Sequence, residues 1–518
     1  MGQNEPRRDL FSRGWHRCGW LLLLALALAG GGMARGQALY DWDGVAMLHP
    51  DERFIVYTVW YAAVPERISV YFDGGCGIPP GLSDAVDPGV FSPDAAAKNA
   101  PPCRSLNPRD QEWSRIFVYG TLPTTLMRVA STALHGSAAT PVQIRDIGRS
   151  GAWLAEMLTV VLVYLAARAL LRREWAALAS LLYALLPLPI QLSHFATVDA
   201  YASPLIVGAL ALLLRLRRLG WGGWMALGSL IGAAAAVRVT LLSLWFVVPL
   251  AWVAWQLLPS RRVWLPAVCA GVWSAVVWWL CDPTIWHDGW FDARWLHDVL
   301  LAGRLVQGLV DTPPSYQWSW QVPYLYPLQQ LAWWGVGPLV GVALVGWLVQ
   351  LRWRVQRLWP LWVWLGGYFA WQGGVFGMTM RYYLPLAAGM AIVAGWALVR
   401  LPRGWRVAAA GVVLGSTAVW ALAWSGMYRL PHPRISASQW IYAAVPTGAT
   451  LGVEIWDDVL PLTFTATERP SRYAIEQLAV FAPDRPNKYI GTDGENGFLA
   501  QLDAVDYLIV SSARASGV

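Results

Sequence analysis

Charge is scarce in this 518-residue chain, since only 14% of the residues are Asp, Glu, Lys or Arg and 56% are hydrophobic. Soluble globular chains carry about 25% charged residues, so this chain has too little polar material to cover a soluble core of its size. The apolar excess must face lipid, in agreement with a mean hydropathy of +0.40. The composition therefore predicts a polytopic membrane protein.

Lysine is almost absent, because Lys98 and Lys488 are the only lysines among 39 basic residues. The arginines form short clusters between apolar runs, without the interleaved aromatic residues of a single-strand binding surface. The net charge of +7 is therefore attributed to membrane topology, and nucleic acid is not expected as a partner.

The five cysteines are too few for a disulfide framework and lack the spacing of a zinc site. Cys18, Cys269 and Cys281 lie in or beside apolar segments and are interpreted as packing residues. Cys76 and Cys103 both lie in the first large polar loop, and we expect a disulfide between them if that loop is exported.

Long apolar runs are abundant, and many approach the ~20 residues that a helix needs to cross a bilayer. The runs without charged residues are 18–34, 175–198, 219–237, 239–260, 263–281, 358–380, 382–399 and 407–428. Further candidates are about 150–167, 200–214 and 331–351. The sequence predicts about eleven transmembrane helices.

Arginine clusters set the predicted orientation, because short cytoplasmic loops carry an excess of basic residues. The tail at 1–17 is arginine-rich, and later clusters fall on the same side of the predicted membrane: Arg168, Arg172, Arg173; Arg215, Arg217, Arg218; Arg261, Arg262; Arg352, Arg354, Arg357; Arg400, Arg403, Arg406. We expect this side to be the cytoplasm, with the C-terminus outside the cell membrane.

The first apolar run has two interpretations. Arg7-Arg8, the run itself and Gly36-Gln37-Ala38 resemble a cleavable signal peptide. A retained anchor is preferred, and in either case the chain after residue 40 begins outside.

The predicted organisation is a cytoplasmic tail at 1–17, a transmembrane domain at 18–425 and an extracytoplasmic segment at 426–518. Outer loops are expected at about 40–148 and 282–330. The first contains an apolar stretch, Ile116–Leu134, which we interpret as an amphipathic segment lying at the interface. The last segment is predicted to be a small α/β unit, with a helix at Ser436–Ala444 and strands at Thr450–Ile455 and Tyr507–Ser511, and it is interpreted as incomplete or very small.

Two acidic features stand on the predicted outer face. Asp51 and Glu52 follow His49-Pro50 just after the first span, where a solvated loop is the alternative interpretation. Asp199 and His194 lie in a loop of a few residues between two apolar helices. A carboxylate at that position is costly unless it is paired or functional, although Asp199 could also cap the next helix.

Three arginines also lie at predicted outer helix ends, where the positive-inside bias does not explain them. Arg149 precedes one span, and Arg238 and Arg381 each lie between two spans. Their guanidinium groups suit phosphate oxygens. The alternative is that each pairs with a nearby carboxylate such as Glu156 or Asp199.

Several motifs resemble the GT-C glycosyltransferases, in particular the protein O-mannosyltransferase-like (family 39) and aminoarabinose-transferase-like group. Similar segments are Asp51-Glu52-Arg53-Phe54, Tyr119-Gly120-Thr121-Leu122-Pro123, Ser193 to Asp199, Arg381-Tyr382-Tyr383-Leu384-Pro385, Ser438-Gln439-Trp440-Ile441 and Glu454-Ile455-Trp456-Asp457-Asp458. The resemblance covers about residues 20–460. It implies an all-α polytopic GT-C fold with a large first outer loop.

The resemblance implies that Asp51 is the base or substrate-orienting acid, supported by Glu52, with Asp199 organising the site. It allows a divalent cation beside Asp199, without metal ligands being identified. His49, Arg149, His194, Arg238, Arg381 and Tyr382 are the expected substrate-binding residues. His287, Asp288, His297 and Asp298 do not form a convincing His-Glu motif of the eukaryotic kind, so a protein acceptor is not favoured.

The sequence therefore predicts an inverting glycosyltransferase that moves a sugar from a polyprenyl-phosphate donor to a lipid, glycan or protein acceptor outside the cytoplasm. A carboxylate can take the proton of an attacking hydroxyl, and cationic groups can stabilise the departing phosphate. A transporter or flippase for lipid-linked saccharides, and a non-catalytic glycan-binding membrane subunit, are the alternatives. A transporter should place ionisable residues at mid-membrane depth, whereas these crowd one face.

Overall fold

The computed structural model describes residues 7–44, 46–65, 71–72, 105–111, 114, 116–254, 261–287, 290–310, 317–353, 358–454, 459–465, 467–478 and 498–510. The predicted disulfide of Cys76 and Cys103 lies outside these residues, as does Asp288.

Most described residues of the predicted apolar runs are helical, because a helix satisfies its backbone polar groups within one segment of the membrane. The helices are α1 (Arg7–Gly36), α6 (Pro141–Ala167), α7 (Arg173–Ala184), α8 (Pro187–Leu192), α9 (Val198–Leu213), α10 (Trp221–Ala235), α11 (Val247–Ala254), α12 (Arg261–Cys281), α14 (Leu325–Gln330), α15 (Leu339–Trp353), α16 (Trp359–Gln372), α17 (Leu384–Arg400) and α18 (Arg403–Gly426). Short turns of helix join some of them: η2 (Leu216–Arg218), η3 (Val239–Phe246), η6 (Leu331–Gly335), η8 (Met380–Tyr383) and η9 (Met427–Arg429).

Among the described residues, five helical segments are long and apolar enough to span a membrane: Gly19–Gly36, Pro141–Ala167, Trp264–Cys281, Met380–Arg400 and Arg403–Ala444. Shorter apolar helices cover Val198–Leu213, Val239–Val253 and Leu339–Gln350. Some predicted runs are interrupted; the run at 175–198 breaks between α7 and α8 at Pro187, because proline disfavours helical geometry in the residue before it. The prediction of an all-α multi-pass membrane protein is confirmed.

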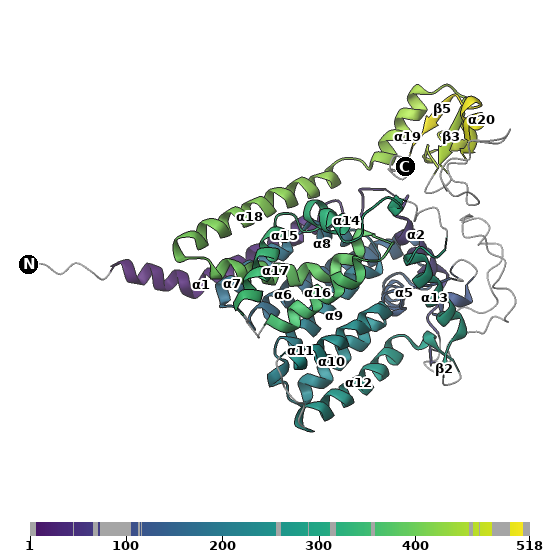
Figure 1. Ribbon diagram of the computed structural model, residues 1–518. Coiled ribbons are helices and arrows are strands. Elements are labelled where there is room, and N and C mark those ends of the chain that lie inside the picture. Colours follow the sequence, from purple (N-terminus) through teal and green to yellow (C-terminus); the bar gives the residue numbers. More distant parts are fainter. Residues whose placement is uncertain are drawn as a thin grey trace, which may run out of the picture.

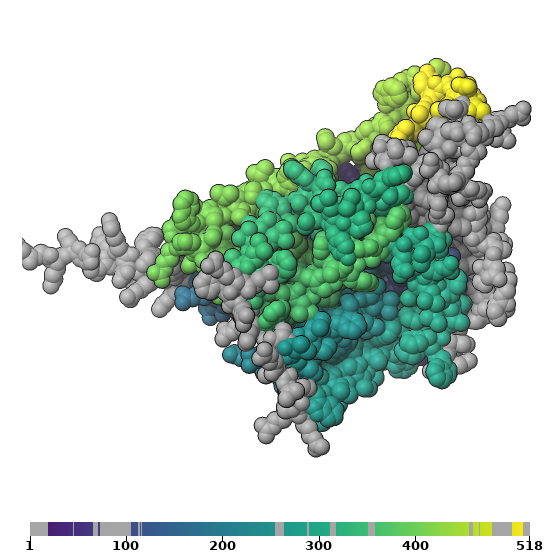
Figure 2. Space-filling model, in the orientation of Figure 1, coloured from purple at the N-terminus to yellow at the C-terminus, as the bar shows by residue number. Residues whose placement is uncertain are grey.

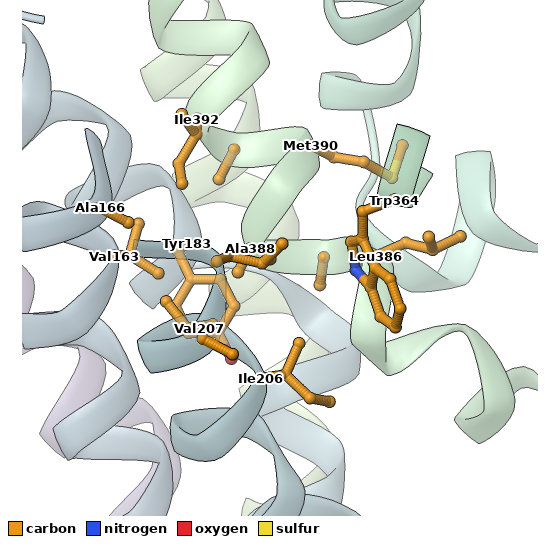
Figure 3. Packing of buried hydrophobic residues seen from close by; sticks show 14 of the residues in the cluster. Val163, Ala166, Tyr183, Ile206, Val207, Trp364, Leu386, Ala388, Met390 and Ile392 are labelled. Atoms are coloured by element: carbon orange, nitrogen blue, oxygen red, sulfur yellow. The ribbon is translucent and has the colours of Figure 1, made fainter. Parts of the chain in front are cut away.

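The transmembrane core forms around α17. In an apolar 18-residue window of its spanning segment 78% of the residues are buried, compared with 17% in such a window of the segment that contains α18. Figure 3 shows Tyr183 of α7 beside Val207 of α9 and Ala388 of α17. Gly395 of α17 lies against α7, where an added Cβ would be only 3.1 Å from the Cβ of Ala179. The neighbouring helices therefore hold α17 on several sides, whereas α18 lies at the edge (Figure 1).

The elements at the opposite end from the arginine-rich loops are short. They are α2 (Pro50–Tyr61), η1 (Pro108–Asp110), α5 (Leu122–His135), η4 (Pro283–Ile285), the antiparallel pair β1 (Trp286–His287) and β2 (Trp290–Phe291), and α13 (Ala293–Val306). Helix α5 falls within the predicted interfacial segment. It buries Met127 and Arg128 and exposes Leu126, Val129 and Leu134, so it is amphipathic.

The C-terminal unit contains α19 (Pro433–Ala444), β3 (Thr450–Glu454), η10 (Pro470–Arg472), β4 (Ala474–Leu478), α20 (Phe498–Asp503) and β5 (Tyr507–Ile509). Its sheet has the order β4-β3-β5, and both pairings are parallel. The predicted helix and the two predicted strands are confirmed. The sequence analysis missed β4, an edge strand whose polar Glu476 and Gln477 hide its pattern.

Candidate functional site

The start of α2 separates two neighbouring carboxylates. His49 caps the helix by accepting the Glu52 amide with Nδ1 at 3.4 Å, and Pro50 occupies the first turn. Asp51 and Glu52 follow at once. Successive side chains on a helix point about 100° apart, so these two acids enter different surroundings.

Glu52 points into the protein and is completely buried. Its Oε1 accepts hydrogen bonds from Arg149 Nε at 2.7 Å and from the Ala196 amide at 2.7 Å. Its Oε2 accepts one from Arg149 Nη2 at 2.6 Å. Arg149 also donates to Asp43 Oδ2 at 2.8 Å and to the Leu39 carbonyl at 2.9 Å. Glu52, Arg149 and Asp43 thus form a closed cluster that joins the chain after α1 to α2, α6 and the loop before α9.

Asp51 points the other way, and 31% of its side chain is exposed. Its Oδ2 accepts a hydrogen bond from Arg381 Nη1, and its Oδ1 accepts one from the Tyr119 hydroxyl at 3.0 Å. Burial alone would raise the pKa of Asp51, but the charge of Arg381, with His49 and the two hydrogen bonds, lowers it to about 2. Asp51 is therefore ionised at neutral pH.

Asp199 lies in the first turn of α9 and pairs with Arg238, with Oδ1 and Nη2 3.0 Å apart. The other carboxylate oxygen, Oδ2, is buried without a hydrogen-bond partner in the described residues. The Nε atoms of Arg238 and Arg381 are unpartnered in the same way. Buried polar atoms are normally satisfied, and all three of these atoms belong to the two half-open ion pairs.

Aromatic rings join the two ion pairs. The Arg238 guanidinium lies over Tyr119 and Tyr382, 5.7 Å and 5.1 Å from their ring centroids. The Arg381 guanidinium lies 5.5 Å from the centroid of Tyr382. Because Tyr119 also hydrogen-bonds Asp51, contacts run from Asp51 through Tyr119 and Arg238 to Asp199. The structure thus brings both aspartates to one site.

The two candidate histidines differ in their surroundings. His49 stacks near Phe195, with ring centroids 4.4 Å apart, and its Nδ1 is 3.9 Å from Asp51 Oδ2. His194 is enclosed: its ring nitrogens are 2.7 Å and 3.1 Å from the carbonyl oxygens of Ile190 and Gln37, and its ring stacks on Tyr428. Burial lowers the pKa of His194 to about 4. His49 thus borders the site, whereas His194 contacts the protein itself.

The three arginines expected at a phosphate do not form one group. The described contacts of Arg149 occupy all three of its nitrogens, so this side chain is closed to a ligand. Arg238 pairs with Asp199, as the alternative interpretation allowed, and Arg381 pairs with Asp51. Glu156 pairs with Arg35, at 3.7 Å, instead of with one of the three.

The sequence analysis did not identify the groups that hold Tyr119. Asp298 of α13 accepts hydrogen bonds from Arg109 Nε at 2.8 Å and from the Phe117 amide at 3.1 Å. Arg109 Nη2 also donates to the Phe117 carbonyl at 2.5 Å. Asp298 was noted in the sequence only within a weak histidine motif. Its contacts instead connect the two outer loops and place the chain that carries Tyr119.

A second set of hydrogen bonds holds the chain on the other side of Tyr119. Asp282, just after α12, accepts hydrogen bonds from the Thr121 amide at 3.1 Å and from its hydroxyl at 2.6 Å. Gly120 approaches the next loop so closely that an added Cβ would lie 2.0 Å from the Ala236 carbonyl oxygen. A residue with a side chain could not replace Gly120 without moving Tyr119 or Arg238.

The described residues do not form a complete site for a divalent cation. Asp51 and Asp199 are each paired with a guanidinium group, and a metal ion that is held by protein alone needs several carboxylate or imidazole ligands. Within the described residues no group of three or more His, Cys, Asp or Glu side chains could hold a metal.

The family model of dolichyl-phosphate-mannose-protein mannosyltransferases matches residues 131–286. This segment includes Arg149, Asp199 and Arg238 but not Asp51 or Arg381. No curated protein sequence matches the chain.

Solved structures are similar over most of the chain. ArnT from Cupriavidus metallidurans in the apo state is 16% identical, with a TM-score of 0.50, and the match covers 89% of this chain and 86% of that one. The same protein bound to undecaprenyl phosphate matches with 15% identity and a TM-score of 0.49, over 90% and 87% of the two chains.

A third match is the archaeal oligosaccharyltransferase AglB from Archaeoglobus fulgidus, in complex with an inhibitory peptide and a dolichol-phosphate. It is 14% identical, with a TM-score of 0.49, over 85% of this chain. This chain spans 63% of the length of AglB. The apo ArnT match shows the fold, and with the family model it confirms the GT-C resemblance seen in the motifs.

Proposed function

We propose that the protein is an inverting glycosyltransferase that moves a sugar from a polyprenyl-phosphate donor to an acceptor hydroxyl on the extracytoplasmic face of the cell membrane. The observation that carries this proposal is the half-open pairing of Asp51 with Arg381 beside Asp199 and Arg238. The GT-C fold and the family match support it.

Asp51 is the proposed proton acceptor. The acceptor oxygen attacks the anomeric carbon of the sugar while the bond from that carbon to the donor phosphate oxygen breaks. The hydroxyl proton passes to the Asp51 carboxylate, and the polyprenyl phosphate leaves with the bonding electrons. Attack from the face opposite the phosphate inverts the anomeric centre. Asp199, through its unpartnered Oδ2, is placed to accept a hydrogen bond from a sugar or acceptor hydroxyl.

Arg381 links donor binding to the strength of the base. With a pKa of about 2, Asp51 is a weak proton acceptor while Arg381 holds it. A donor phosphate gives Arg381 a competing anion, whose oxygens suit the guanidinium fork. As Arg381 turns towards that phosphate, the pKa of Asp51 rises towards its ordinary value. The base thus becomes effective when the donor is present, and Arg238 adds a second positive charge for the leaving group.

Glu52 and Arg149 act in this proposal through position alone. Their closed cluster fixes the start of α2, and so the direction of Asp51. His194 has the same kind of role at the loop before Asp199. These assignments differ from the expected catalytic role of Glu52 and the expected substrate-binding roles of Arg149 and His194.

One ion pair inside the membrane domain bears on the transporter alternative. Glu156 lies on α6, seven residues beyond Arg149, and pairs with Arg35 at the end of α1. Tyr183 donates to Glu156 Oε2 at 2.8 Å. A transport path also contains ionisable residues at depth, but it must be reachable by water or substrate. Arg35 and Glu156 have no exposed surface, so this pair serves packing and the transferase remains the preferred function.

The direct test uses purified full-length protein in proteoliposomes, radiolabelled polyprenyl-phosphate sugars and a membrane extract as the acceptor source. We expect Asp51→Asn to lower transfer about 10²- to 10⁴-fold, the usual contribution of a general base. Asp41→Asn is the matched control, because Asp41 is an exposed aspartate on the same outer segment. Transfer by well-folded Asp51→Asn at the wild-type rate with every active donor would refute the mechanism.

The side of the membrane is tested separately with single cysteines in a cysteine-free background. His297→Cys lies at an exposed position near the site, and Arg403→Cys lies at the arginine-rich end. We expect a membrane-impermeant maleimide to label the cysteine at position 297 in intact cells and not the cysteine at position 403. The opposite labelling would place the site in the cytoplasm and exclude this orientation.

A further inference from the structure

A groove on the membrane domain lies between α15, α17 and α18. Its volume is about 620 Å³, within the range of roughly 300–1,000 Å³ that small-molecule sites have. The lining is apolar apart from one arginine: Pro338, Gly341, Val342, Val345, Val349, Trp396, Ala397, Leu398, Arg400, Leu401, Ala409 and Val413. The groove is distinct from the site around Asp51.

The shape of the groove follows from how its three helices pack. Helix α15 lies close to α17, where an added Cβ on Gly346 would be 3.0 Å from Ala397. Helix α18 lies along the edge of the molecule (Figure 2) and meets the chain before α15 at Trp420, whose Nε1 donates to the Trp333 carbonyl at 2.7 Å. The groove lies between these contacts, and Arg400 and Leu401 place one end of it at the arginine-rich end.

The dimensions fit one leaflet of a bilayer. The lining runs from Pro338, just before α15, to Val349 on α15, about 16 Å at 1.5 Å per residue. That is about half of the ~30 Å hydrocarbon core. Nothing lies within 4 Å of an added Cβ on Gly341, so the groove is open beside this residue. An extended acyl chain matches such a space better than a helix, which is about 10 Å wide.

Arg400 gives the groove a charged end. Its guanidinium lies 4.9 Å from the ring centroid of Trp396, and in the described chain no carboxylate forms an ion pair with it. Arg381 lies in η8, just before α17, and Arg400 is the last residue of α17. The two are 19 residues apart, about 28 Å along a helix. A phosphate bound at Arg400 therefore lies in the opposite leaflet from Asp51 and cannot be the reacting phosphate of the donor.

We propose that this groove binds one anionic phospholipid of the arginine-side leaflet, with an acyl chain between α15 and α18 and the phosphate at Arg400. The acyl chain of the lipid takes the place of protein contacts that α18 does not make along α15. A negatively charged head group is preferred because Arg400 lines this end of the groove. The bound lipid thus fixes α18, the helix that leads to the C-terminal unit.

Native mass spectrometry of delipidated full-length protein tests this proposal. Phosphatidylglycerol, phosphatidylcholine with the same acyl chains, and undecaprenyl phosphate are added in separate titrations. We expect one tightly bound phosphatidylglycerol and weaker phosphatidylcholine. Arg400→Ala should weaken phosphatidylglycerol binding about fivefold, the contribution of one basic residue at an anionic surface. Gly341→Leu should remove this binding by filling the groove.

Two matched variants serve as controls. Arg403→Ala removes an exposed arginine from the same end, and Gly411→Leu adds a side chain on α18 where an added Cβ also meets nothing within 4 Å. Neither position lines the groove, so both should bind phosphatidylglycerol nearly as the wild type does. Equal binding of the two phospholipids, or unchanged binding by Arg400→Ala, would overturn the proposal. Tighter, Arg400-dependent binding of undecaprenyl phosphate would assign the groove to a different lipid.

Discussion

Asp51 and Glu52 are adjacent in the sequence, and each pairs with an arginine from a distant helix, yet their surroundings differ. Glu52 and Arg149 are 0% and 1% exposed, and every oxygen of Glu52 is hydrogen-bonded. Asp51 and Arg381 are 31% and 18% exposed, and Arg381 Nε has no partner in the described chain. The comparison shows that an ion pair alone does not identify a reacting group.

Exposure separates the two kinds of pair. A sealed pair cannot exchange a partner without leaving a buried charge uncompensated. A half-open pair can exchange one partner for a ligand, because water and the ligand compensate both charges. We therefore assign stability to the Glu52 cluster and chemistry to the Asp51 pair, and the following variants test that division.

Arg149→Met should have the largest effect on the folded protein. It leaves Glu52 and Asp43 buried without their cation, which costs about 3–5 kcal/mol. Size-exclusion chromatography and the thermal midpoint in detergent measure the loss. Arg381→Met is the matched variant, because Asp51 stays partly hydrated, and we expect it to fold. Equal stability of the two variants would remove the distinction between sealed and open pairs.

Arg381→Met should instead lower transfer about 10²- to 10³-fold, as the loss of one group that stabilises developing charge does. Arg381→Lys should recover part of this activity, since it keeps the charge but loses the planar fork. Initial rates at varied donor concentration measure both variants. If Arg381→Met retained the wild-type kcat and donor KM, Arg381 would have no role at the phosphate.

Tyr119→Phe should have a smaller effect, about tenfold on transfer. It removes the hydroxyl that donates to Asp51 at 3.0 Å, and hydrogen bonds to charged groups contribute about 1.5–3 kcal/mol. Losing that donor raises the pKa of Asp51, so the acid limb of the rate profile should move to higher pH.

Tyr61→Phe is the control for this prediction. Tyr61 lies on the same helix, α2, and its hydroxyl has no hydrogen-bond partner among the described residues. Its removal should leave both the rate and the pH profile unchanged. An identical response of the two variants would mean that Tyr119 contributes its ring alone.

Much of the fold could be predicted, because membrane helices are determined by local composition. Apolar runs such as 263–281 and 382–399 became α12 and α17 almost within their predicted bounds. The interruptions were harder to predict. The π-helical turn η6 at Leu331–Gly335 depends on packing against other helices, which the local sequence does not encode.

The site could be predicted only in part, because its contacts join distant segments. The residue types pointed to Asp51, Asp199, Arg238 and Arg381, and the structure brings these four together. The sequence could not reveal that Arg149 bonds to Glu52, 97 residues away, and so is closed to a ligand. Asp298 looked like part of a weak motif, although it holds the Phe117 backbone 181 residues away.

The smallest effect expected is a pH dependence of stability from His194. Its pKa is about 4 in the folded protein against an ordinary value of 6.5, so below pH 6.5 the unfolded chain gains a proton that the folded chain does not. Stability therefore falls as the pH drops from 6.5 towards 4, by up to about 1.4 kcal/mol per pH unit. Asp51 does not contribute here, because its lowered pKa affects stability only near and below pH 4.

Thermal midpoints measured at pH 7.5 and 5.5 isolate the contribution of His194 to stability. Between these two pH values the midpoint of the wild type should fall by about 2 °C more than that of His194→Gln does. His297→Gln, at a position that is 71% exposed, should behave like the wild type. A wild-type midpoint that changes no more than that of His194→Gln would mean that the enclosed imidazole takes up a proton without cost. The two carbonyl oxygens beside its ring would then bind an imidazolium. The surroundings of His194 would in that case accept a charge, as those of Asp51 do and those of the sealed Glu52 cluster do not.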